Sequence, residues 1–177
     1  MKWLLYAIIG CTALALPCTA QESDTHSHQQ DCPMHQQMAS TDHEHASHDL
    51  DQRGEQGMGF NQKSTTHHFL LKDDGGIIQV TANSAEDRAA VDQIRKHLQH
   101  IAREFQSGDF NIPMFVHDQT PPGVQLMKKL NNQISYTYAE VENGGRVEIS
   151  SQQPEAVAAV HEFLKFQITE HRTGDRQ

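Results

Sequence analysis

Hydrophobic residues recur with a period of two in four short runs of the chain, and this pattern predicts four β-strands. The first two runs cover residues 67–72 and 77–82, and the last two cover residues 134–141 and a run through Val147 and Ile149. Within each pair, the runs are separated by a short polar segment that contains Gly-Gly, a pair of residues favoured in tight turns. Two β-hairpins are therefore expected.

Each predicted hairpin is followed by apolar residues at the three-to-four spacing of an amphipathic helix. The first helix is expected to run to about Phe105, and Ser84 with Asp87 has the look of a capping box at its start. The second is expected to begin at Pro154 and to be terminated by Gly174. Both helices present one apolar face, which favours packing against the sheet.

The two halves of this pattern match at an offset of 69 residues, which superimposes Gly75 on Gly144. The match is expected to slip near its end, because Leu98 aligns with Gln167 rather than with Ile168. We therefore predict an α+β fold built from a duplicated strand-strand-helix unit, with a four-stranded antiparallel sheet and two long helices on one face.

The first 20 residues have a different pattern, with Lys2, an apolar run from Trp3 to Leu16 and a small residue at Ala20. This is typical of a secretory signal peptide that is cleaved after Ala20, so the mature protein is expected in the periplasm or outside the cell. A lipoprotein anchored at Cys11 is the alternative interpretation. No later stretch approaches the length of a transmembrane segment, so none is expected in the mature chain.

Residues 21–57 contain few large apolar side chains and many Gln, Ser, Asp and His, a composition typical of a disordered segment. We therefore expect a disordered arm over residues 21–57 and one domain over residues 58–177. The chain has 13 histidines among 177 residues. Nine side chains of the arm are of metal-ligating types: His26, His28, Cys32, Met34, His35, Met38, His43, His45 and His48.

These side chains predict transition-metal binding, because neutral imidazole binds Cu(II), Zn(II) and Ni(II), whereas thiolate and thioether select Cu(I). The segment containing Cys32, Met34 and His35 resembles the opening of a small module that binds heavy metals in bacterial efflux proteins, although the module's second Cys-Pro-x-Cys element is absent. Copper, as Cu(I) or Cu(II), is the expected ion, with zinc or nickel as alternatives. An efflux or delivery protein is the expected partner, and an inert polar tether is the competing interpretation of the arm.

The domain carries a second set of candidates. His67 and His68 are neighbours in a strand and point to opposite faces, so at most one of them can join a buried site. Gln167 and His171 share the apolar face of the last helix, where a buried polar group needs a partner. Residues 109–123 are expected to form a proline-rich loop before a short helix that starts near Pro121. The candidate residues of the domain are His67, His68, His97, Met114, His117, Asp118, Gln167 and His171.

A formal net charge of −9 without a basic cluster argues against nucleic acid as a partner. No nucleophile elbow, phosphate loop or His-Glu-x-x-His helix is present in the sequence. An enzyme would therefore depend on the domain histidines meeting in space, for example as an open metal site. Metal binding is the preferred hypothesis, and a metal-dependent or histidine-based enzyme and a protein-interaction module with a flexible tether are the alternatives.

Residues 58–175 resemble a family of small exported bacterial proteins without an established activity. The resemblance is carried by Met58-Gly59-Phe60, by residues 65–69, by the segment around His117 and by residues 170–175. Sequences of this kind are often labelled as aspartate carbamoyltransferases. Those enzymes consist of two doubly wound α/β domains and bind carbamoyl phosphate with a Ser-Thr-Arg-Thr-Arg element. This chain is about half as long as those enzymes and lacks the element, so we reject that activity.

Overall fold

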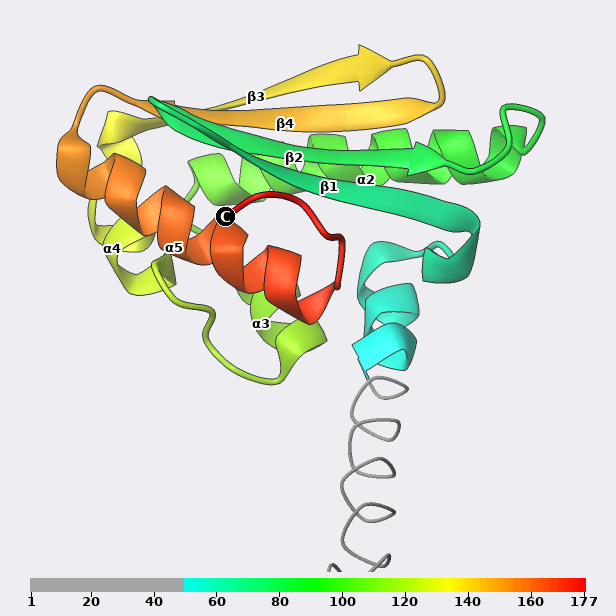
Figure 1. The fold of residues 1–177 in the computed structure, drawn as a ribbon, viewed down its shortest axis with the longest axis horizontal. Coiled ribbons are helices and arrows are strands. Elements are labelled where there is room, and N and C mark those ends of the chain that lie inside the picture. The colour runs from blue at the N-terminus through cyan, green and yellow to red at the C-terminus, as the bar shows by residue number, and fades with distance from the viewer. Residues whose placement is uncertain (1–49) are drawn as a thin grey trace, which may run out of the picture.

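A four-stranded antiparallel sheet carries two long helices on one of its faces in the computed structural model, which describes residues 50–177 (Figure 1). The sheet order is β1-β2-β4-β3. Helix α5 packs against β1 and β2, and α2 packs against β3 and β4. The predicted α+β architecture is thus confirmed. The bounds are β1 (Thr65–Lys72), β2 (Gly75–Ala82), α2 (Arg88–Gln106), α3 (Asn111–His117), α4 (Val124–Lys129), β3 (Ile134–Val141), β4 (Gly144–Ser151) and α5 (Pro154–Glu170), with 3-10 turns η1 (Gln62–Ser64) and η2 (Asn131–Gln133).

The strand registers repeat at the offset of the sequence duplication. Thr65 pairs with Ala82 in the first hairpin, and 69 residues later Ile134 pairs with Ser151 in the second. At the centre of the sheet, β2 and β4 pair so that Ile78 lies opposite its own equivalent, Val147. The fold is therefore two copies of one strand-strand-helix unit, joined through their second strands.

The expected slip of the duplication near the end of α5 is wrong. Leu98 and Gln167 both lie in the core, with exposed fractions of 1% and 4%. The offset of 69 residues therefore continues through Gln167, which occupies a core position of the second unit although it is polar. This exception matters for the site described below.

The glycine pairs lie in the strands rather than in the turns, which corrects the predicted hairpins. The turns consist of residues 73–74 and 142–143 alone, and Gly75 and Gly144 are the first residues of β2 and β4. A Cβ on Gly75 would overlap the Ile149 carbonyl, and a Cβ on Gly144 would overlap the Val80 carbonyl. These glycines therefore allow β2 and β4 to approach, a role that sequence periodicity does not distinguish from a turn.

Helix α2 buries the predicted face, but its first turn is capped by a different residue. The Asp87 carboxylate accepts a hydrogen bond from the Ala90 amide at 3.0 Å and is the N-cap. Ser84, which the capping-box pattern had favoured, accepts a bond from Glu86 before the helix begins. Helix α5 begins at Pro154 as predicted, because proline lacks only an N–H that the first turn does not need.

Residues 109–123 are not a loop, because α3 forms within them. Pro113 is the third residue of α3, where its missing N–H costs no helical bond. The next helix, α4, begins at Val124 after Gly123, and not near Pro121 as predicted. Gly123 has φ of 78° and lies directly against the Ala159 carbonyl, so the chain can turn here without a side-chain clash.

The folded domain includes residues that precede the boundary predicted at residue 58. Residues 50–58 are helical, and Arg53 Nε donates a hydrogen bond of 3.0 Å to the carbonyl of Val116 in α3. The end of the predicted arm therefore belongs to the folded domain. The signal sequence and the nine arm ligands lie outside the described residues. Among residues 50–177, no helix has the length and apolar character needed to cross a bilayer.

Candidate functional site

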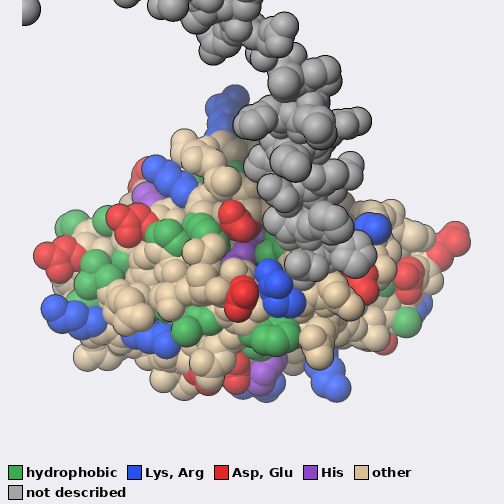
Figure 2. Space-filling view, turned by 90° about the horizontal axis from the view of Figure 1, so that it is seen from below, with side chains coloured by type: hydrophobic (Ala, Val, Ile, Leu, Met, Phe, Trp, Pro, Cys, Tyr) green, Lys and Arg blue, Asp and Glu red, His purple; other side chains and the backbone are tan. Residues whose placement is uncertain are grey.

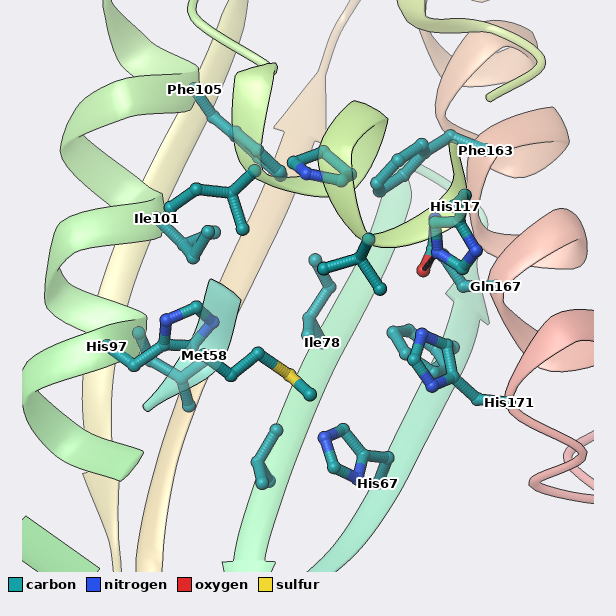
Figure 3. A pocket seen from close by; sticks show the side chains of 16 residues that line it. Met58, His67, Ile78, His97, Ile101, Phe105, His117, Phe163, Gln167 and His171 are labelled. Carbon is teal, nitrogen blue, oxygen red and sulfur yellow. Dashed lines mark hydrogen bonds between the residues drawn. The ribbon is translucent and has the colours of Figure 1, made fainter. Parts of the chain in front are cut away.

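A cavity of about 60 Å³ lies under β1 and β2, between the facing sides of α2 and α5 (Figure 3). Helix α3 and Met58 complete its wall. A water molecule needs at least about 10–15 Å³ of such space, so the cavity has room for a few waters or for one ion. Most of the wall is apolar, and its polar members are four histidines and one glutamine: His67, His97, His117, His171 and Gln167.

The alternation of β1 decides which of its two histidines enters this cavity. His67 shares the inner face with Phe69, which is 4% exposed, and its Nε2 atom is buried without a hydrogen-bond partner among the described residues. His68 faces the other way, and its Nδ1 lies 2.9 Å from Asp175 Oδ1. The same carboxylate accepts the Phe69 amide at 2.9 Å, so the C-terminal residues fasten the edge of β1.

His117 and Gln167 form the buried polar pair of the cavity. His117 Nε2 lies 2.9 Å from Gln167 Oε1. Because that amide oxygen can only accept, Nε2 carries the proton, and the Nδ1 atom of the neutral ring holds a free lone pair. Nδ1 is buried and has no hydrogen-bond partner within residues 50–177, and the nearest carboxylate oxygen, Glu170 Oε2, is 3.9 Å away. The Gln167 amide nitrogen is also buried and unpartnered there.

His171, which caps the C-terminus of α5, lies between the other two rings. Its centroid is 5.6 Å from that of His67 and 5.2 Å from that of His117. Two imidazoles bound to one ion at about 2.0–2.1 Å have centroids roughly 5–6 Å apart, so these spacings are those of rings that can share an ion. His97 lies across the cavity on α2, and its ring contacts Phe60 edge-on at 5.6 Å.

All four imidazoles are held in the neutral form. Burial lowers the pKa of His67 and of His97 to about 4, and neighbouring histidines lower both pKa values further. Burial, followed by the nearby His67 and His117, lowers the pKa of His171 to about 3. Burial also lowers the pKa of His117, although the bond to Gln167 and the charge of Glu170 oppose this shift. Neutral imidazole is the metal-ligating form, so no proton has to leave these rings before a cation binds at neutral pH.

The internal duplication shows that the fold does not require these polar side chains. The positions equivalent to His67, Gln167 and His171 in the other unit are occupied by Tyr136, Leu98 and Ala102, and all three of those residues are buried. The same architecture therefore closes over an apolar residue at two of the three positions. The polar side chains lie where β1 packs against α5 and line the cavity there, whereas the equivalent contact of β3 with α2 is formed by Tyr136, Leu98 and Ala102. This asymmetry favours a role in binding over a role in packing.

Five of the eight sequence candidates meet at the cavity, and three do not. His68 is bound to Asp175 on the outer side of β1. Asp118 is the exposed C-cap of α3, and the Met114 sulfur is 3.9 Å from Lys128 Nζ. Sequence reasoning missed Met58, which follows a polar segment and has no periodic neighbour to mark it.

The rings are not yet arranged as a finished metal centre. Within residues 50–177, no three His, Cys, Asp or Glu side chains are already placed around one point. Ligation therefore requires the imidazoles to rotate toward a common centre.

The helical side of the domain, seen in Figure 2, mixes acidic and basic side chains with small hydrophobic areas, and a histidine reaches the surface near its middle.

The arrangement can offer nitrogen lone pairs to a cation in a partly enclosed, mainly apolar space. Its second contribution is the Gln167 amide, which fixes the tautomer of His117, as an outer-shell partner does in metal sites. No protein-family model, curated protein or solved structure matches this chain.

Proposed function

We propose that the chain is an exported transition-metal-binding protein that sequesters or delivers copper in the periplasm. In this proposal the arm captures the ion, and the cavity of the α+β domain holds it. The arm ligands lie outside the described residues, so their part rests on sequence chemistry. The cavity adds neutral imidazoles from β1, α2, α3 and α5.

The observation that carries the proposal is a set of buried nitrogens that find no hydrogen-bond partner among residues 50–177. His67 Nε2, His117 Nδ1 and Gln167 Nε2 all belong to the cavity wall. A buried polar group left without a hydrogen bond costs about 1–3 kcal/mol, so each of the three atoms needs a partner, and the cavity beside them has room for one. An ion bound by the two imidazole nitrogens would satisfy two of them, and the amide is free to hold a water or a further ligand.

The proposal is tested by metal loading of the mature chain and of two matched variants. The cavity variant carries His117→Gln and His171→Gln, and the arm variant replaces all nine arm ligands by serine or leucine. We expect the cavity variant to lose about one equivalent of bound copper in equilibrium dialysis with elemental analysis. The arm variant should keep that equivalent and lose the others.

His161→Gln is the control, because the His161 ring bonds the Lys72 carbonyl at 2.9 Å and lies outside the cavity wall. It should bind as much copper as the unmodified chain. Undiminished loading of the cavity variant would show that the domain does not hold the ion. Copper uptake by neither the unmodified chain nor the arm variant would dispose of the whole proposal.

A further inference from the structure

Met58 projects into the histidine cavity. Figure 3 shows its thioether between His97 on one side and His67 and His171 on the other. A thioether is a weak hydrogen-bond acceptor but a good ligand for soft metal ions. Its position among neutral imidazoles therefore bears on which ion the cavity can hold.

The segment that carries Met58 is fixed to the domain on both sides of this residue. Before it, Arg53 bonds the Val116 carbonyl, and Gly57 lies so close to Val116 that an added Cβ would stand 3.1 Å from its methyl group. After it, Gly59 turns the chain at φ of 80°, and Phe60 is buried with its ring 6.1 Å from that of His67. The packing of the residues on both sides of Met58 therefore fixes the position of Met58 at the cavity.

The charge of the cavity favours a monovalent ion. None of the described residues that line it is Asp or Glu, and the nearest carboxylate among them, that of Glu170, belongs to a side chain that is 36% exposed. Without an anionic ligand, the desolvation cost of a buried ion grows with the square of its charge, so a dication costs about four times as much as a monocation. An apolar wall with neutral nitrogen and sulfur ligands therefore disfavours Zn(II) and Cu(II) relative to Cu(I).

Building on the proposed function, we infer that the cavity is a Cu(I) site, with the Met58 thioether joining His67, His117 and His171 as a ligand. The thioether selects the reduced ion, and Gln167 keeps the Nδ1 lone pair of His117 directed to it. Met58 follows the predicted arm in the chain, so the ligand nearest the arm in sequence is a soft one, like Cys32, Met34 and Met38 within it.

The test uses the full mature chain with ¹³C-labelled methionine methyl groups under anaerobic conditions, with Ag(I) as a redox-stable probe and then Cu(I). The Met58 methyl resonance, assigned through Met58→Leu, should shift and saturate when the cavity holds one equivalent, in addition to the ions that the arm takes up. The Met114 methyl should not move, because Met114 lies outside the cavity wall. The methyl signals of Met34 and Met38 in the arm are assigned by leucine substitution in the same way, so the two regions are followed separately.

Met58→Leu should lower the Cu(I) affinity, measured at the His117 and His171 ring resonances, by about tenfold or more. The same variant should change the Zn(II) affinity by less than about twofold. Met114→Leu should change neither the Cu(I) nor the Zn(II) affinity. Leucine is close to methionine in volume, so the fold should be kept. Shifts of the two histidine rings with a silent Met58 would overturn the Cu(I)-thioether assignment and leave the proposed metal site standing. Silence of both the rings and Met58 would remove the Cu(I) assignment and, with it, the part of the cavity in the proposed function.

Discussion

Replacement of Gln167 by leucine separates a binding role of the polar pair from a structural one. Leucine is the residue at the equivalent position of the other unit, Leu98, so the fold is known to accept it there. The change removes the acceptor of the 2.9 Å bond from His117 Nε2. It also removes the amide nitrogen of Gln167, which is buried without a partner in the described domain.

The magnitudes nearly cancel for the metal-free protein. An unpaired His117 N–H costs about 1–3 kcal/mol, and loss of the unpartnered Gln167 amide nitrogen returns about the same amount. We therefore expect the free energy of unfolding of the metal-free chain to change by less than about 1 kcal/mol. Metal affinity should nevertheless fall about 10–100-fold, since the His117 tautomer is no longer fixed by an outer-shell acceptor.

The assay combines urea denaturation of the metal-free chain with a titration followed at the His117 and His171 ring resonances. Gln93→Leu, at an exposed position of α2, is the control for loss of an amide elsewhere. A metal-free chain destabilised by more than about 3 kcal/mol would mean that the pair is a structural element of the core. An affinity equal to that of the unmodified chain would refute its role in the site.

Three further outcomes follow from the structure. The folded-state pKa values of His67 and His97 are about 4 and that of His171 is about 3, so the unfolded chain binds more protons below the ordinary value of 6.5. Stability should therefore be complete above about pH 6.5 and fall as the pH is lowered towards 4, with up to about 1.4 kcal/mol per pH unit from each ring. Urea denaturation at pH 7 and pH 5 checks this, and equal midpoints would contradict it. Asp175→Ala should destabilise the edge of β1 by about 1–3 kcal/mol, because the Phe69 amide loses its acceptor, and hydrogen exchange of that amide should accelerate. Gly123→Ala should lower the free energy of unfolding by at least about 3 kcal/mol, because of the positive φ at this position and the overlap of the new Cβ with the Ala159 carbonyl. Gly59→Ala introduces the same backbone strain in open space and should lower it by about 1–2 kcal/mol. Similar melting temperatures for the two variants would contradict the overlap at Gly123.

The sheet and its two long helices were predictable because each element carries its own periodic signal. The duplication was visible in the Gly-Gly pairs, and the structure repeats it in every strand pair. Helix α3 was not predicted because its residues lie in a segment with three prolines, which favours a loop, whereas proline is accepted in a first helical turn. The cap of α2 was assigned to Ser84 because the pattern alone does not decide between two acceptors three residues apart.

The sequence indicated individual residues of the site but not which of them lie close together in the fold. Alternation in β1 makes His67 or His68 face inward, and the helical projection of α5 places Gln167 on the buried side. What sequence could not supply is the partner of each group. His117 is 50 residues away from Gln167 in the chain, and only the packing of α3 against α5 brings the two together. Met58 carries no periodic signal, and its inward position depends on tertiary contacts of the preceding helix.

The central claim is that the cavity between α2 and α5 binds a metal ion through its histidines. Crystals of the mature chain, loaded anaerobically with Cu(I) and measured at the copper absorption edge, test it most directly. We expect one strong anomalous peak in the cavity, with the rings of His67, His117 and His171 rotated towards it and the Met58 sulfur beside it. A well-ordered domain with copper on its surface only, and these rings where they lie in Figure 3, would contradict it.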